Sequence, residues 1–209
     1  MSRIYKRISG AELVNLIIPL VLMLALFGGY DELKERNDSG TYLNFADAII
    51  SGEIFTTPDL SELKFARLAR TPGYPLIIVA AKTLFPDETT GLLYLHLLFA
   101  ALSIVFLSLV FRAWCPPVIT GLIIVAAQIL MREYFVTVMT EWVVFNLLLV
   151  LFGMLIVSIR NTSLRNLFVL GLLASLTLLI RPTTAPVLLM MPFVFLYRWK
   201  FRITEMFVL

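Results

Sequence analysis

Long apolar blocks separated by short polar turns fill most of the chain, and this pattern predicts membrane-spanning helices. A helix needs about 20 consecutive apolar residues to cross the hydrocarbon core of a bilayer, with a range of about 17–25. We therefore expect an all-α, polytopic transmembrane bundle of about six spans. The expected spans are residues 11–29, 91–112, 116–133, 141–159, 164–181 and 183–197. The first is interpreted as an uncleaved span, because its apolar run is longer than that of a signal peptide.

Residues 30–90 interrupt this pattern with a long polar segment, which we interpret as a juxtamembrane loop. Part of it has apolar residues at three- and four-residue spacing, which is typical of one face of an amphipathic helix. That face consists of Tyr42, Phe45, Ala46, Ile49 and Ile50. Gly52 is a plausible end for this helix, and Thr57, Pro58 and Asp59 have the residue types of a second helix start. We expect such short helices to lie at the membrane surface.

Residues 72–85 form an apolar run that is short for a span and contains two prolines. A span here would also invert every later loop and place most of the later arginines outside. We therefore expect this segment to lie on the outer surface of the bilayer or to dip into it.

The composition supports a membrane protein and excludes several other classes. The chain has 209 residues, of which 60% are hydrophobic and 15% charged, whereas soluble domains have nearer half and a quarter. The net charge is +3, and the basic residues are scattered, which is not typical of a nucleic-acid surface. With Cys115 and His96 as the single residues of their types, a disulfide framework or a Cys/His metal site within the chain is not expected. No cofactor is predicted, but carboxylates alone can bind a divalent cation, so a cation site stays open. His96 is expected to be a hydrogen-bonded residue of the bundle.

The distribution of lysine and arginine predicts a cytoplasmic N-terminus. With that orientation the cytoplasmic side carries nine basic residues against Glu12 and Glu205. The nine are Arg3, Lys6, Arg7, Arg112, Arg160, Arg165, Arg198, Lys200 and Arg202. The outer segment 30–90 has ten acidic and six basic residues. We therefore treat residues 1–209 as one multi-pass transmembrane domain.

Polar residues from distant parts of the sequence fall at the outer ends of the expected spans. They are Asp38 with Tyr42, Arg70, Glu141 and Arg181. A carboxylate placed there can accept a proton from an attacking hydroxyl. Arginines can hold a phosphate through charge-assisted hydrogen bonds. Together they suit a phosphorylated lipid that enters a site sideways from the bilayer.

Each of these residues also has a simpler interpretation. Asp38 has the residue type of a turn or a helix cap. Glu141 is close enough in sequence to Arg132 to form an ion pair within one loop. Arg70 and Arg181 are placed where long side chains reach from helix ends to lipid headgroups.

The ordered stretches "DSGTYLNFADAIISGEIF", "RTPGYPLIIVAAKTLFP", "TEWVVFNLLL" and "LLIRPTTAPVLLMMP" resemble the N-terminal half of bacterial membrane glycosyltransferases of the GT-C fold. That family includes relatives of the protein mannosyltransferases and of the aminoarabinose transferase that acts on lipid A. The matched positions are Asp38, Tyr42, Gly52, Arg70, Pro72, Gly73, Tyr74, Pro75, Glu141, Arg181 and Pro182.

The resemblance implies transfer of a sugar from a polyprenyl-phosphate donor to a lipid, glycan or protein acceptor on the outer face of the bacterial inner membrane. It implies inversion at the sugar, with Asp38 as the catalytic base and Glu141 as a second acidic group. The substrate-binding residues would be Tyr42, Arg70, Tyr74 and Arg181. Membrane lipids would surround the chain, and no nucleic acid would bind.

Members of this family generally have more spans than the six expected here. The resemblance therefore leaves three interpretations open: a fragment, a truncated gene product, or a half that assembles with a further chain that supplies the missing spans. In each case we expect that the 209 residues alone do not turn over the donor. Other readings stay open: a transporter or membrane assembly subunit, an inactive truncated glycosyltransferase, or another lipid-linked enzyme such as a polysaccharide polymerase or ligase.

Overall fold

The computed structural model describes residues 9–36, 38–52 and 71–193, and within these ranges the chain is built from helices. The helices are α1 (Gly10–Phe27), α2 (Ser39–Ile50), α5 (Gly73–Leu84), α6 (Glu88–Phe111), α7 (Pro117–Leu130), α8 (Arg132–Phe135), α9 (Thr140–Arg160), α10 (Leu164–Ile180) and the 3₁₀ helix η1 (Pro182–Thr184). Residues 185–193 continue as an α-helix. The predicted all-α class is thus confirmed for the described residues.

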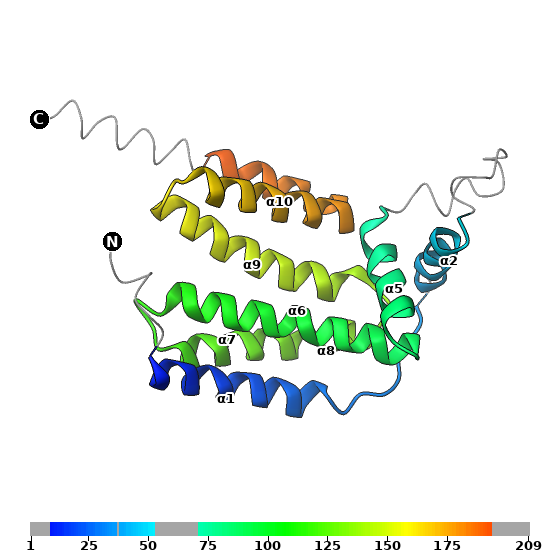
Figure 1. Ribbon diagram of the computed structural model, residues 1–209, viewed down its shortest axis with the longest axis horizontal. Coiled ribbons are helices and arrows are strands. Elements are labelled where there is room, and N and C mark those ends of the chain that lie inside the picture. The colour runs from blue at the N-terminus through cyan, green and yellow to red at the C-terminus, as the bar shows by residue number, and fades with distance from the viewer. Residues whose placement is uncertain (1–8, 37, 53–70, 194–209) are drawn as a thin grey trace, which may run out of the picture.

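The long helices lie side by side, and α2 and α5 lie across one end of them (Figure 1). α1 packs against α6 and α7, α6 packs against α9, and α9 packs against α10. Each long helix runs antiparallel to the one before it in the chain, so every second connection falls at the same end (Figure 1). We call this the α5 end, and it also receives the turn before α9 and the turn after α10.

Within the described residues, three helices are long and apolar enough to cross a membrane, namely α1, α6 and α9, with 18, 24 and 21 residues. They correspond to the expected spans 11–29, 91–112 and 141–159. α7 and α10 are apolar but shorter, with 14 and 17 residues. The expected span 116–133 is longer than the helix observed. α7 ends at Leu130 because Met131 leaves helical geometry, and the short helix α8 follows from Arg132. Of the expected span 183–197, residues 183–184 belong to η1 and 185–193 are α-helical, while 194–197 lie outside the described residues.

α5 has 12 residues and packs against both α2 and α6. Gly73 lets this helix approach the end of α10, because a Cβ atom at this position would lie 2.5 Å from the carbonyl oxygen of Leu179. The hydroxyl of Thr71 donates a hydrogen bond of 3.0 Å to the carbonyl of Ile180. These contacts explain why a glycine begins the "GYP" motif, and they fix α5 across the end of α10.

The predicted amphipathic helix is α2, with Tyr42 and Ala46 buried as expected. Ile50 is half exposed, and Ala48 is buried in its place, so the buried face is turned slightly relative to the prediction. Gly52 follows the helix with φ of +74°, a left-handed conformation that ends helices and favours glycine. The second helix predicted from Thr57 lies outside the described residues.

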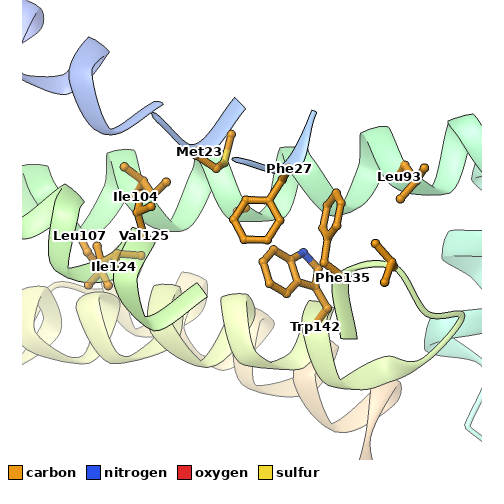
Figure 2. Close-up of a cluster of buried hydrophobic side chains, with 11 residues drawn as sticks. Met23, Phe27, Leu93, Ile104, Leu107, Ile124, Val125, Phe135 and Trp142 are labelled. Carbon is orange, nitrogen blue, oxygen red and sulfur yellow. The ribbon is translucent and has the colours of Figure 1, made fainter. Parts of the chain in front are cut away.

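An aromatic cluster forms the core beneath the α5 end (Figure 2). The ring of Phe27 from α1 lies 5.0 Å from that of Phe135 in α8 and 5.3 Å from that of Trp142 in α9. Phe135 and Trp142 are fully buried and meet edge to face at 5.1 Å. The indole N–H of Trp142 donates to the carbonyl of His96 at 3.0 Å. This cluster therefore fixes the first turn of α9, where Glu141 lies.

A buried polar network joins α6, α7 and α9 farther from that end. The Gln128 amide nitrogen donates to Asn146 Oδ1 at 2.9 Å, and the Ser103 hydroxyl donates to the same oxygen at 2.8 Å. Asn146 Nδ2 donates to the carbonyl of Trp142 at 2.9 Å. All three polar side chains of the network are fully buried. The apolar periodicity of the sequence did not predict this network.

Candidate functional site

Segments that are distant in sequence meet at the α5 end, and backbone hydrogen bonds join two of them, the segment before α2 and the segment before α9. The Lys34 N–H donates to the carbonyl of Val136 at 2.7 Å, and the Val138 N–H donates to the carbonyl of Lys34 at 3.2 Å. The hydroxyl of the buried Ser39 donates to the carbonyl of Val138 at 3.0 Å. The start of α2 is therefore fixed to the turn that leads directly into Thr140 and Glu141.

Asp38 occupies the N-cap position of α2, immediately before Ser39. Its φ and ψ of −88° and −15° are already helical, and its side chain makes no capping hydrogen bond. The residue is partly buried. The interpretation of Asp38 as a helix cap thus holds for its position but not for the hydrogen bond that a cap supplies.

Glu141 and Arg181 form an ion pair, in which Glu141 Oε1 lies 2.5 Å from Arg181 Nη1. The side chains are 20% and 36% exposed, respectively. Arg181 also donates to two hydroxyls, from Nη1 to Thr140 at 3.3 Å and from Nε to Thr183 at 3.0 Å. Two residues that were predicted to converge are therefore in direct contact.

The ion pair between Glu141 and Arg132 that the sequence allowed is not the one formed. Arg132 starts α8, whereas Glu141 lies in the first turn of α9 and faces the end of α10. A separate ion pair joins Arg36 to Glu133 at 3.4 Å, with side chains 47% and 76% exposed.

Tyr42 and Tyr74 pack edge to face, with ring centroids 5.2 Å apart. Tyr74 is fully buried, and its hydroxyl lies 3.4 Å from His96 Nε2. His96 Nδ1 lies 2.7 Å from the carbonyl oxygen of Phe135, which can only accept, so Nδ1 carries the hydrogen. Nε2 is then the acceptor for the tyrosine hydroxyl. His96 is a hydrogen-bonded residue of the bundle, as predicted.

The surroundings of the Tyr74 hydroxyl keep it protonated. Burial raises the pKa of this group far above the ordinary value of 10.0, and electrostatic interactions with Tyr42 and Glu141 raise it further. A hydrogen bond from the backbone of Met139 acts in the opposite direction but is outweighed. Tyr42 and Tyr74 were predicted to bind substrate. In the structure both lie in a buried cluster with residues of α5, α6 and α9, and Tyr74 has no exposed surface.

A second charged cluster, which sequence reasoning missed, fastens α2 to the bundle. Lys82 Nζ of α5 lies 2.6 Å from Asp47 Oδ1 of α2 and 3.2 Å from Glu88 Oε2 of α6. Burial lowers the pKa of Lys82, but the hydrogen bonds and charges of the two carboxylates outweigh burial and raise it overall. No spacing signal in the sequence marks Lys82 as the shared partner of these two carboxylates.

The remaining predicted site features are placed as follows. Arg70 lies outside the described residues. Within the described ranges, no three His, Cys, Asp or Glu residues are grouped so that they could hold a metal ion. The structure thus joins Glu141 to Arg181, and it brings the segment that carries Asp38 against the start of α9.

No protein-family model, curated protein or solved structure matches the chain. In the part of the chain that the structure describes, the protein is all-helical, with three helices long and apolar enough to cross a membrane and with ion pairs gathered at one end.

Proposed function

We propose that this protein is a membrane glycosyltransferase with a GT-C-like fold of about six spans. It would transfer a sugar from a polyprenyl-phosphate donor to a lipid, glycan or protein acceptor. The observation that carries the proposal is the convergence of Asp38, Glu141 and Arg181 at one end of an apolar bundle, from three segments that are distant in sequence. The order of motifs that resembles the GT-C family supports the same function.

In this proposal the Asp38 carboxylate accepts the proton of the acceptor hydroxyl. The acceptor oxygen then forms a bond to the anomeric carbon of the sugar. The bond from that carbon to the phosphate oxygen breaks, and its electron pair leaves with the polyprenyl phosphate. This is a single direct displacement, so the configuration at the anomeric carbon inverts. It requires one base and one leaving group. Arg181 would stabilise the negative charge on the departing phosphate.

The α5 end would face the outside of the bacterial inner membrane, with the N-terminus in the cytoplasm. The opposite end carries Arg112, Arg160 and Arg165, as expected of a cytoplasmic side. Single cysteines at the exposed Gly40 and Asn161 test this in a variant without Cys115. An impermeant thiol reagent added outside spheroplasts should label the first and not the second. Labelling of both from one side would reject the orientation.

The enzymatic proposal is tested with the full chain in proteoliposomes, alone and with a candidate partner chain, against a panel of polyprenyl-phosphate sugars. Asp38→Asn should lower the rate by about 10²–10⁴, the usual size of a general-base effect, and change donor binding less. Asp31→Asn is the matched control, because it removes the same charge from an exposed position in the same loop. Near-normal turnover of Asp38→Asn would remove Asp38 from the catalytic role.

A transporter is a second candidate, and one observation favours it. The network of Ser103, Gln128 and Asn146 places polar groups inside the bundle, where transporters commonly hold their substrates. The network carries no formal charge, however, and its members mainly bond one another. The test is solute uptake by proteoliposomes that contain the full chain. Uptake that is abolished by Asn146→Leu and unchanged by Asp38→Asn would favour transport over sugar transfer.

A further inference from the structure

The end of the bundle opposite the α5 end is basic. α6 and α9 end there and α10 begins there, so Arg112, Arg160 and Arg165 lie at the same end (Figure 1). Among the described acidic residues, Glu12 alone lies at this end, and its carboxylate accepts two hydrogen bonds from Ser9 at the start of α1. The described part of this end therefore has more positive than negative charge. In a bundle that crosses a membrane, such an end lies at the level of the lipid headgroups.

One arginine at this end is stacked on an aromatic ring. The guanidinium carbon of Arg160 lies 3.4 Å from the centroid of the Trp114 ring, which belongs to the turn between α6 and α7. This cation–π contact uses the flat face of the guanidinium, whereas its five N–H donors lie in its plane. The stacking therefore orients Arg160 without using the donors that recognise the oxygens of a phosphate group.

Aromatic rings continue from this arginine toward the middle of the bundle. The Trp114 ring centroid lies 5.6 Å from that of Phe111, and the Phe111 ring stacks on Phe152 with centroids 6.4 Å apart. Trp114 and Phe152 are each more than half exposed. Phe152 lies eight positions before Arg160 in α9, or about 12 Å along the helix. The surface thus combines a cation at headgroup level with exposed rings that reach toward the hydrocarbon core.

We infer that this surface, formed by Arg160, Trp114, Phe111 and Phe152, binds an anionic phospholipid of the surrounding bilayer. The headgroup phosphate pairs with the Arg160 guanidinium, and one acyl chain lies along the exposed rings. A zwitterionic lipid binds less well, because its headgroup carries a cation that the arginines repel. A soluble phosphate matches the charge but gains nothing from the rings. Lipid binding at this end is independent of sugar transfer at the α5 end.

The test is quenching of Trp114 fluorescence by phospholipids that carry bromine on an acyl chain. The full chain has three tryptophans, and Trp199→Phe serves as the background variant. With Trp142 fully buried, quenching then reports lipid beside Trp114. The protein is reconstituted in phosphatidylcholine vesicles, into which brominated phosphatidylglycerol or brominated phosphatidylcholine is titrated. We expect phosphatidylglycerol to reach half of its maximal quenching at the lower mole fraction, and the ratio of the two mole fractions measures the lipid preference.

Three variants separate a site from diffuse attraction between charges. Arg160→Gln should lower the preference for phosphatidylglycerol about fivefold, the contribution of one arginine beside an anionic lipid. Arg160→Lys keeps the charge but loses the planar stacking, so it should retain part of the preference. Arg165→Gln is the matched control, because it removes the same charge from an exposed position at the same end. Its effect should be less than about twofold, since a solvent-exposed charge is screened by salt. Emission from the buried Trp142 checks that each variant is folded.

Equal quenching of the wild-type background by the two brominated lipids would overturn the inference. An equal loss of preference in Arg160→Gln and Arg165→Gln would also overturn it, because the attraction would then have no site. Displacement of brominated phosphatidylglycerol by soluble glycerol phosphate would overturn the lipid assignment. None of these measurements requires sugar transfer or a particular orientation, because the lipid is present in both leaflets. Failure of the proposed function and failure of lipid binding are therefore distinguishable.

Discussion

The hydroxyl of Ser39 donates a hydrogen bond of 3.0 Å to the carbonyl of Val138, across 99 positions of sequence. The oxygen of the Ser39 hydroxyl also accepts a hydrogen bond of 2.8 Å from the Arg36 N–H, and Ser39 is fully buried. This one hydroxyl therefore joins the segment that carries Asp38 to the turn that leads into α9, where Glu141 lies.

Replacing Ser39 with alanine should loosen the start of α2. The change leaves the Arg36 N–H and the Val138 carbonyl without this partner, at a cost of about 1–3 kcal/mol in the free energy of unfolding. Thermal unfolding in detergent should occur at lower temperature, and amide hydrogens of α2 should exchange faster. Ser51→Ala is the control, because its exposed hydroxyl makes only a weak bond of 3.4 Å to the Ala48 carbonyl. Unaltered exchange in α2 would show that Ser39 does not hold it.

Gly73→Ala should separate α5 from α10. The added Cβ would meet the backbone of Leu179 and Ile180 at 2.5–2.7 Å, and backbone atoms cannot turn away as a side chain can. We expect a loss of about 1–3 kcal/mol, the usual cost of overpacking, measured as a lower unfolding midpoint. Gly40→Ala adds the same atom where nothing lies within 4 Å, and should be neutral or stabilising. Similar stability of the two variants would contradict the close approach.

The Lys82 cluster should make the docking of α2 sensitive to alkaline pH. Because its carboxylate partners raise the pKa of Lys82 in the folded state above the ordinary 10.5, the folded protein holds this proton more tightly than the unfolded chain does. The stabilisation is therefore fully present below about pH 10.5 and is lost as the pH rises through the higher folded value. Hydrogen exchange of α2 should accelerate over that window in the wild type.

Lys82→Met should show fast exchange of α2 already at neutral pH and lose only the part of the alkaline response that belongs to the ammonium. Tyr74 contributes to alkaline destabilisation in both proteins, because burial raises its pKa as well. The informative quantity is therefore the difference between the two pH profiles. Lys34→Met, at an exposed lysine, serves as the control. Parallel profiles for wild type and Lys82→Met would reject the role of the cluster.

The network in the bundle should respond differently to partial and to complete removal. Asn146→Leu removes the acceptor that the buried Gln128 amide and Ser103 hydroxyl share, and leaves the Ala100 carbonyl as the acceptor within reach of both. We expect a loss of about 1–3 kcal/mol in the free energy of unfolding. The triple variant Ser103→Ala, Gln128→Leu, Asn146→Leu replaces all the partners with apolar groups and should recover much of that loss. Unfolding midpoints in detergent make the comparison. A triple variant less stable than Asn146→Leu would show that the network contributes net stability.

The sequence by itself determined the elements that depend on local pattern. Apolar runs of sufficient length predicted α1, α6 and α9, because a helix that faces lipid or protein on all sides needs no alternation. The three- and four-residue spacing around Tyr42 predicted α2, and Gly52 predicted its end because its positive φ is open to glycine. Charge asymmetry placed the outer segment and Glu141 at one end, and the described helices α2 and α5 and the start of α9 lie together at the α5 end.

Only the tertiary structure decided which polar groups meet. The sequence left Glu141 free to pair with Arg132, nine positions away, and the fold pairs it with Arg181, forty positions away, because the start of α9 packs beside the end of α10. It also gave no sign that Lys82 joins two carboxylates, or that Ser103 and Gln128 share the side-chain oxygen of Asn146 as an acceptor. Pairing between polar side chains depends on how each helix is rotated about its axis and shifted along it relative to its neighbours. Apolar periodicity does not determine these positions. Local pattern thus determines where helices form, and packing determines which of their polar side chains come together.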